Sequence, residues 1–185
     1  MNPLPSNYYD FFGLPHTLDL DLSELEKRFY ALSRQHHPDR YTLKSPEEQQ
    51  YALDATAILN DAYRTLRDPL VRAEYLLKEN GFDIGEQGAK NVPPELLEEV
   101  FELNMALEEL RGGDESARPA LEQARNKFLG MRDEIDTQLA GRYREYDGSH
   151  DRNALAEIRG MLNRRRYIRN LVNEVEKELA GVAAA

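Results

Sequence analysis

Apolar residues recur at steps of three and four along this 185-residue chain, and no stretch alternates apolar with polar residues as a half-buried strand does. In the N-terminal part this spacing predicts two amphipathic helices. Their buried faces contain, in order, Leu22, Leu25, Phe29 and Leu32, then Ala55, Ile58, Leu59, Ala62 and Leu66. The pattern therefore predicts an all-α fold.

Capping residues and prolines set the ends of these two helices. Asp21 is a good N-cap, with Glu24 three residues later as its capping-box partner. Pro38 disfavours helical geometry at His37, so the first helix ends there. The sequence SPEEQ at 45–49 begins the second helix with a capping box and a proline at the first helical position. We expect an antiparallel helical hairpin with a short loop.

The chain divides into two parts. NYYDFFGLP, from Asn7, and PLVRAEYLLKEN, from Pro69, predict short helices beside the hairpin. GFDIGEQGAKNVPP is rich in glycine and proline and has no period, which is typical of a boundary. We predict a first domain at 1–80, a linker at 81–93, and a second domain at 94–185.

The second domain is predicted to be a three-helix bundle. Its helices are expected at about 94–111, about 115–140 and about 151–180, separated by RGGD and YDGSHD. The first of them has two apolar stripes. Leu96, Val100, Leu103, Leu107 and Leu110 form the natural core face, whereas Leu97, Phe101 and Met105 lie well around the helix. Since a bundle helix needs only one buried face, the second stripe predicts either a binding surface or packing against the first domain or the linker.

The hairpin loop carries the cluster HHPD. A metal site needs three or four converging ligands, and the other two histidines, His16 and His150, have no helical pairing with the cluster. General base catalysis needs a pocket and a nucleophile or positioned water, which the neighbouring sequence does not indicate. We therefore expect no metal, no cofactor and no enzymatic activity, and a polar loop that is presented to another protein.

Composition restricts the partners and the compartment. The net charge of −10 argues against a broad nucleic-acid surface, and the adjacent arginines of NRRRYIRN point in different directions on a helix. The chain has no cysteine, no apolar run near the roughly 20 residues that span a bilayer, and no signal or transit pattern at its start. We expect a cytoplasmic protein with no membrane or nucleic-acid partner.

NYYDFFGLP, the helix before HHPDR, and LNDAYRTLRDPLVRAEYLL together resemble a J-domain, the module by which DnaJ-type co-chaperones engage a seventy-kilodalton heat-shock chaperone. The resemblance covers about residues 7–77. It implies that His37, Pro38 and Asp39 stimulate the chaperone's ATPase. It also implies that a basic surface meets the chaperone, made here by Lys27, Arg28, Arg34 and Arg40.

The helical second half resembles that of the HscB family, J-domain co-chaperones of iron–sulfur cluster biogenesis. The resemblance implies two partners, an HscA/DnaK-type chaperone and an IscU-type scaffold protein. It implies that the scaffold binds Leu97, Phe101, Glu102 and Tyr167, whereas Met105 departs from the acidic residue of the family. The alternative is a J-domain co-chaperone of another pathway with a different client.

Overall fold

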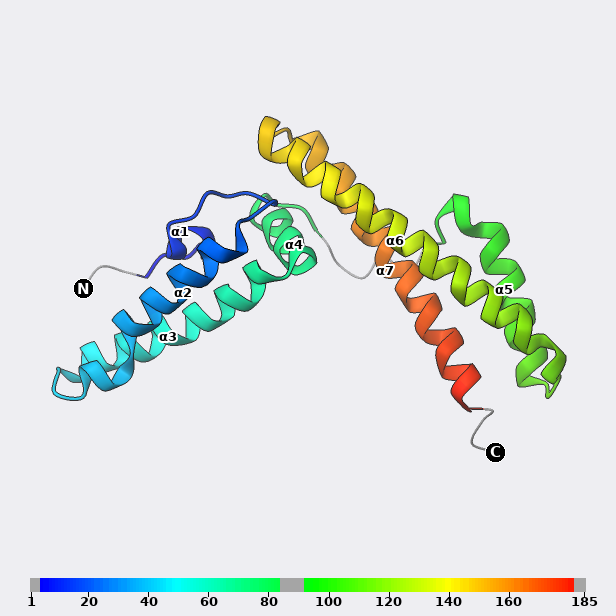
Figure 1. Ribbon diagram of the computed structural model, residues 1–185, viewed down its shortest axis with the longest axis horizontal. Helices are drawn as coiled ribbons and strands as arrows, with labels where there is room; N and C mark the ends of the chain where they lie inside the picture. The colour runs from blue at the N-terminus through cyan, green and yellow to red at the C-terminus, as the bar shows by residue number, and fades with distance from the viewer. Residues whose placement is uncertain (1–3, 84–91, 182–185) are drawn as a thin grey trace. The chain divides into compact units, whose positions relative to one another are not determined.

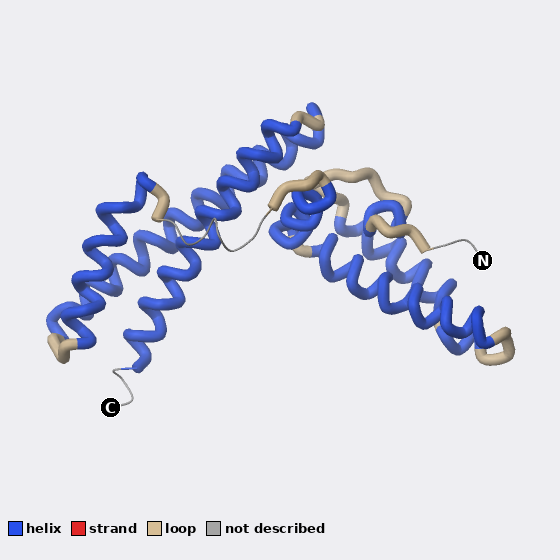
Figure 2. Tube along the Cα trace, turned by 180° about the vertical axis from the view of Figure 1, so that it is seen from behind, coloured by secondary structure: helices blue, strands red, loops and turns tan. Residues whose placement is uncertain are grey.

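The computed structural model describes residues 4–83 and 92–181, and within these ranges every regular element is a helix (Figures 1 and 2). Most of the predicted linker, 84–91, lies outside the described residues. The chain forms two compact units. One comprises Met1–Gly81 with Tyr146–His150, and the other comprises Phe82–Glu145 with Asp151–Ala185. The all-α prediction is confirmed.

The first unit is built on a helical hairpin. Its elements are α1 (Tyr8–Phe12), α2 (Leu22–His36), the 3-10 turn η1 (Pro38–Tyr41), α3 (Pro46–Arg67) and α4 (Pro69–Glu79). Helices α2 and α3 lie side by side and antiparallel, and η1 stands at the end of the hairpin (Figure 1). The predicted hairpin is confirmed, including the end of α2 just before His37.

The predicted apolar faces supply part of the core of this unit, and the rest comes from α1, the segment after it and α4. Leu25 of α2 packs with the face of α3 that contains Ala55, Leu59, Ala62 and Leu66, all nearly inaccessible to solvent. Phe29, Leu32 and Ile58 are only half-buried. Leu22, at the first position of α2, is 47% exposed. Arg72 of α4 is buried, and its guanidinium donates hydrogen bonds to the carbonyl oxygens of Leu18 and Leu66. The sequence pattern did not predict this buried charge.

One predicted capping box forms completely and the other only in part. Glu48 N–H donates to Ser45 Oγ (3.3 Å), and Ser45 N–H donates to Glu48 Oε2 (3.0 Å). Asp21 accepts from N–H groups of the first turn of α2 as predicted. The carboxylate of Glu24 instead accepts from Arg28 Nε at 2.7 Å. The predicted reciprocal bond at Glu24 is therefore wrong, because a cation one turn later takes its place.

Within its described residues, the second unit contains three helices and two short 3-10 turns. They are η3 (Pro94–Leu96), α5 (Leu97–Arg111), η4 (Glu115–Ala117), α6 (Arg118–Ser149) and α7 (Arg152–Gly181). Helix α6 continues well past the predicted end near residue 140. Leu139 and Tyr143 are buried four residues apart, and Arg142 pairs with Glu157 of α7 at 3.1 Å. Packing against α7 therefore extends α6 beyond Gly141.

Ion pairs show the direction in which α5 and α7 run. Arg164 of α7 pairs with Glu95 just before α5 at 2.7 Å, and Arg111 at the end of α5 pairs with Glu174 of α7 at 3.1 Å. The two helices therefore run side by side in the same direction (Figure 1). Arg165 binds Asp136 of α6, so neighbouring arginines do point to different helices.

Among the described helices, none combines the length and apolarity needed to cross a membrane.

Candidate functional site

The turn at His37–Asp39 is exposed and braced by its own hydrogen bonds. The Asp39 N–H donates to His37 Nδ1 (3.3 Å), and the Arg40 N–H donates to the His37 carbonyl (3.0 Å). The Asp39 carboxylate lies 3.6 Å from Nδ1, and its side chain is 85% exposed. The turn thus offers a fixed imidazole and a free carboxylate side by side.

Side chains also satisfy the last carbonyl groups of α2, which a helix leaves without intrahelical partners. Arg40 donates to the carbonyl of Arg34 (3.2 Å), Tyr41 Oη to that of Gln35 (3.4 Å), and Thr56 Oγ1 of α3 to that of His36 (3.2 Å). These bonds hold η1 against the end of α2. Arg40, predicted as a chaperone contact, therefore also stabilises the turn.

His36, next to the turn, is buried rather than presented. Its ring lies near those of Phe11 (6.3 Å between centroids) and Tyr51 (5.9 Å), and only 8% of the residue is exposed. Burial lowers the pKa of His36, because removing water disfavours the charged ring.

In the chain as far as it is described, no three His, Cys, Asp or Glu side chains are grouped as metal ligands.

The basic residues predicted on α2 fall into two groups. Lys27 and Arg34 are exposed, and neither forms an ion pair or side-chain hydrogen bond with the described residues. Tyr30 lies between them and is 53% exposed. Sequence reasoning missed Tyr30, although the spacing of three and then four residues puts it on the same helix face. Together these three side chains form an exposed basic and aromatic surface.

Arg28, in contrast, is bound within the first unit. Its guanidinium donates to the carbonyl oxygens of Phe12 (2.8 Å) and Gly13, and to the carboxylate of Glu24. Gly13 ends α1 with φ of 62°, a conformation that glycine adopts without steric cost, and a Cβ there would stand 3.1 Å from Arg28 Nη1. Arg28 thus joins α1 to α2.

The two predicted stripes of α5 differ in exposure as expected. Leu96, Val100, Leu103, Leu107 and Leu110 are all buried, whereas Leu97, Phe101 and Met105 are 57%, 66% and 50% exposed. Glu98, Glu102, Glu108 and Glu109 are exposed around this second stripe, and none forms an ion pair in the described ranges. We call Leu97, Phe101 and Met105 with these four glutamates the outer face of α5. It combines an apolar centre with an acidic rim.

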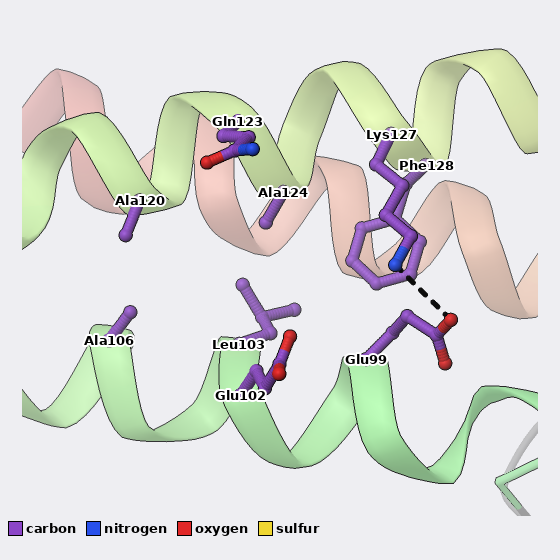
Figure 3. Close-up of a pocket in the computed structure, with 9 residues that line it drawn as sticks. All are labelled: Glu99, Glu102, Leu103, Ala106, Ala120, Gln123, Ala124, Lys127 and Phe128. Atoms are coloured by element: carbon purple, nitrogen blue, oxygen red, sulfur yellow. Dashed lines mark ion pairs between the residues drawn. The ribbon is translucent and has the colours of Figure 1, made fainter.

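Of the other two predicted client residues, Glu102 belongs to the outer face and Tyr167 lies on α7. Tyr167 is half-buried on α7, between Arg164 and Glu174, whose ion pairs reach both ends of α5. Partial burial raises the pKa of Tyr167. Glu102 instead stands at the rim of a groove between α5 and α6 (Figure 3). The predicted client residues therefore span from the α7 side of α5 to its α6 side.

Comparison with known proteins identifies the family. The protein-family model described as DnaJ domain matches residues 7–75, and the family model described as HSCB C-terminal oligomerisation domain matches residues 92–176. The chaperone HscB from Vibrio cholerae is 32% identical, with 95% of this chain and 99% of that chain covered and a TM-score of 0.61. The chain belongs to the HscB family. The human co-chaperone HscB is 25% identical, with 95% and 84% covered and a TM-score of 0.68.

Membership confirms the resemblance of both halves. HscB-family proteins are J-domain co-chaperones of iron–sulfur cluster biogenesis, and a J-domain indicates a seventy-kilodalton heat-shock chaperone as partner. The hairpin with its HHPD turn lies within the J-domain match, and the outer face of α5 lies within the match to the HscB C-terminal domain.

Proposed function

We propose that this HscB-family chain presents the turn at His37–Asp39 to an HscA/DnaK-type chaperone and stimulates its ATPase, while the outer face of α5 binds an IscU-type scaffold protein. Residues 1–80 then serve the chaperone and residues 94–185 serve the client, joined by 81–93. The observation that carries this proposal is the braced, exposed turn within a J-domain match. The chain performs no catalysis itself.

The turn suits recognition by a cationic partner. Asp39 projects an unburied carboxylate that can accept a guanidinium through two parallel hydrogen bonds, which are stronger than neutral ones. Pro38 and the hydrogen bonds of η1 fix the backbone before binding, so less conformational entropy is lost on docking. Lys27 and Arg34 add positive charge on α2 that favours an acidic chaperone surface.

The outer face of α5 suits a partner that is apolar and basic. Leu97, Phe101 and Met105 are each at least half exposed and do not belong to the buried core of the bundle. A central apolar cluster inside a polar rim is the usual anatomy of a protein interface. Tyr167 and Glu102 extend the surface to either side of α5. The match to the HscB C-terminal domain favours a scaffold of iron–sulfur assembly over a client from another pathway.

A reconstitution with purified chaperone and scaffold tests the proposal. The wild-type chain is expected to accelerate ATP hydrolysis by the chaperone, and Asp39→Asn is expected to abolish the acceleration without changing scaffold binding. Phe101→Ala is expected to weaken scaffold binding while the melting temperature stays unchanged. Full stimulation by Asp39→Asn would show that the turn is not the chaperone site. If the wild-type chain does not bind the scaffold, the proposal that the outer face of α5 is a client site is wrong.

A further inference from the structure

A groove between α5 and α6 lies beside the outer face of α5. Its floor is apolar, since Ala106 and Leu103 of α5 face Ala120 and Ala124 of α6, and the ring of Phe128 lies toward the end near Lys127 (Figure 3). Its free volume is about 210 Å³. This is below the roughly 300–1,000 Å³ of pockets that hold whole small molecules. The space therefore fits one or two apolar side chains rather than a cofactor.

The two carboxylates that line the groove differ in their surroundings. At one end, Lys127 of α6 forms an ion pair with Glu99 of α5 at 3.2 Å (Figure 3). The pKa of Glu99 is lowered by a hydrogen bond from its own backbone and then by the one from Lys127. Glu102, one turn of α5 further on, has no such cation among the described residues. The ion pair of Glu99 with Lys127 therefore closes one end of the groove, whereas the carboxylate of Glu102 borders it without a cation in the described ranges.

From this arrangement we infer that the groove is a second subsite for the client, taking an apolar side chain that stands next to a basic residue. The basic residue meets Glu102, and the apolar side chain covers Ala106, Ala120 and Ala124. This inference rests on the proposed function, because the subsite continues the outer face of α5 on its α6 side. It adds α6 to a client surface that otherwise consists of α5 and α7.

Charge argues against a second copy of this chain as the occupant. A two-fold dimer through this region would bring the outer face of α5 against itself, because symmetric interfaces pair the same patch on both subunits. Glu98, Glu102, Glu108 and Glu109 would then face four identical carboxylates, and like charges across an interface are unfavourable. A client that is basic around an apolar side chain is complementary to the same surface.

Filling the groove tests the inference. Ala120 is exposed and Ala124 is half-buried, so leucine at either position extends into the groove without displacing a core side chain. We expect Ala120→Leu and Ala124→Leu each to weaken binding of purified IscU-type scaffold about tenfold, as loss of an apolar anchor does. Ala140→Leu is the matched control, since Ala140 is exposed on α6 and does not line the groove. It is expected to bind like the wild type.

The outcomes separate the inference from the proposed function. Weakened binding by Phe101→Ala, together with wild-type binding by both groove variants, would overturn the groove subsite and leave the outer face as the client site. Wild-type binding by Phe101→Ala, or no scaffold binding at all, would overturn both. Melting curves accompany each titration. Should Ala124→Leu unfold the bundle, the exposed Ala120→Leu still decides the result.

Discussion

The turn at His37–Asp39 and the outer face of α5 are both exposed, but the fold prepares them in different ways. The turn is polar, and the hydrogen bonds of η1 with the end of α2 hold its backbone in one conformation. The outer face consists of side chains on a regular helix, and it combines apolar residues that the bundle leaves uncovered with a rim of glutamates. Polar recognition thus depends here on local bracing, and apolar recognition on surplus hydrophobic surface.

The largest expected effect is at the turn. His37→Gln removes the exposed imidazole of the turn, and we expect it to abolish stimulation of the chaperone's ATPase. Because His37 is exposed and contributes no core contact, the melting temperature should stay nearly unchanged. Steady-state ATPase rates and a thermal melt on the same preparation check this. If His37→Gln stimulates the chaperone as well as the wild type does, the turn is not the chaperone site.

The two stripes of α5 provide the next test. Leu103→Ala or Leu107→Ala is expected to destabilise the second unit by about 2–5 kcal/mol, as truncation of a buried leucine does. Leu97→Ala combined with Phe101→Ala should cost little stability and should weaken scaffold binding by at least about 2 kcal/mol, as loss of central apolar anchors does. Denaturant unfolding and scaffold titrations measure the two quantities. If the double variant of Leu97 and Phe101 destabilises the unit as much as the core variants do, the outer face packs within the protein and is not a binding surface.

Arg28 and Lys27 are adjacent on α2 but are expected to behave differently. Arg28→Ala removes hydrogen bonds to α1, so it should lower the free energy of unfolding by about 1 kcal/mol, since its side chain is partly exposed. Lys27→Ala should leave stability unchanged and slow association with the chaperone. That association should also slow as salt rises, because the Debye length falls to about 3 Å at 1 M. Stopped-flow association rates and thermal melts distinguish these roles. If the two variants change stability and association rate to the same extent, Arg28 and Lys27 do not have different roles.

The smallest predicted effect concerns His36. Its folded pKa lies below the value of 6.5 for a free histidine, so the native state holds the neutral ring. Its contribution to stability is therefore complete above about pH 6.5 and is lost as the pH falls through the lower folded pKa. One proton limits the slope to about 1.4 kcal/mol per pH unit. Unfolding curves between pH 5 and 8 should show a fall in stability toward low pH that is smaller in His36→Phe than in the wild type, and identical pH dependence would contradict this.

Local sequence predicted the hairpin and its turn because the signals there are local. Pro38 ends α2, and Ser45 with Glu48 begins α3, whatever else surrounds them. The same reasoning separated the two stripes of α5, since helical period alone decides which residues share a face. The turn motif also had a family resemblance to support it. The outer face of α5 was indicated both by its second apolar stripe and by the resemblance to the HscB family.

Features that depend on distant partners were not predictable in this way. Helix α6 continues past Gly141 because Tyr143 packs and Arg142 finds Glu157 across the hairpin of α6 and α7. Arg28 was assigned to the basic surface because sequence shows its charge but not the carbonyl groups at the end of α1 that bind it. The groove between α5 and α6 requires knowing which alanines of two helices face each other. None of these follows from one helix considered alone.

The central claim is that one chain carries two separable sites, and a crossed measurement tests it most directly. Asp39→Asn and the double variant Leu97→Ala with Phe101→Ala are each assayed for scaffold affinity and for stimulation of the chaperone in the absence of scaffold. We predict that Asp39→Asn loses stimulation and binds scaffold normally, and that the double variant stimulates normally and binds scaffold weakly. Loss of both activities in either variant, with the protein still folded, would contradict the account.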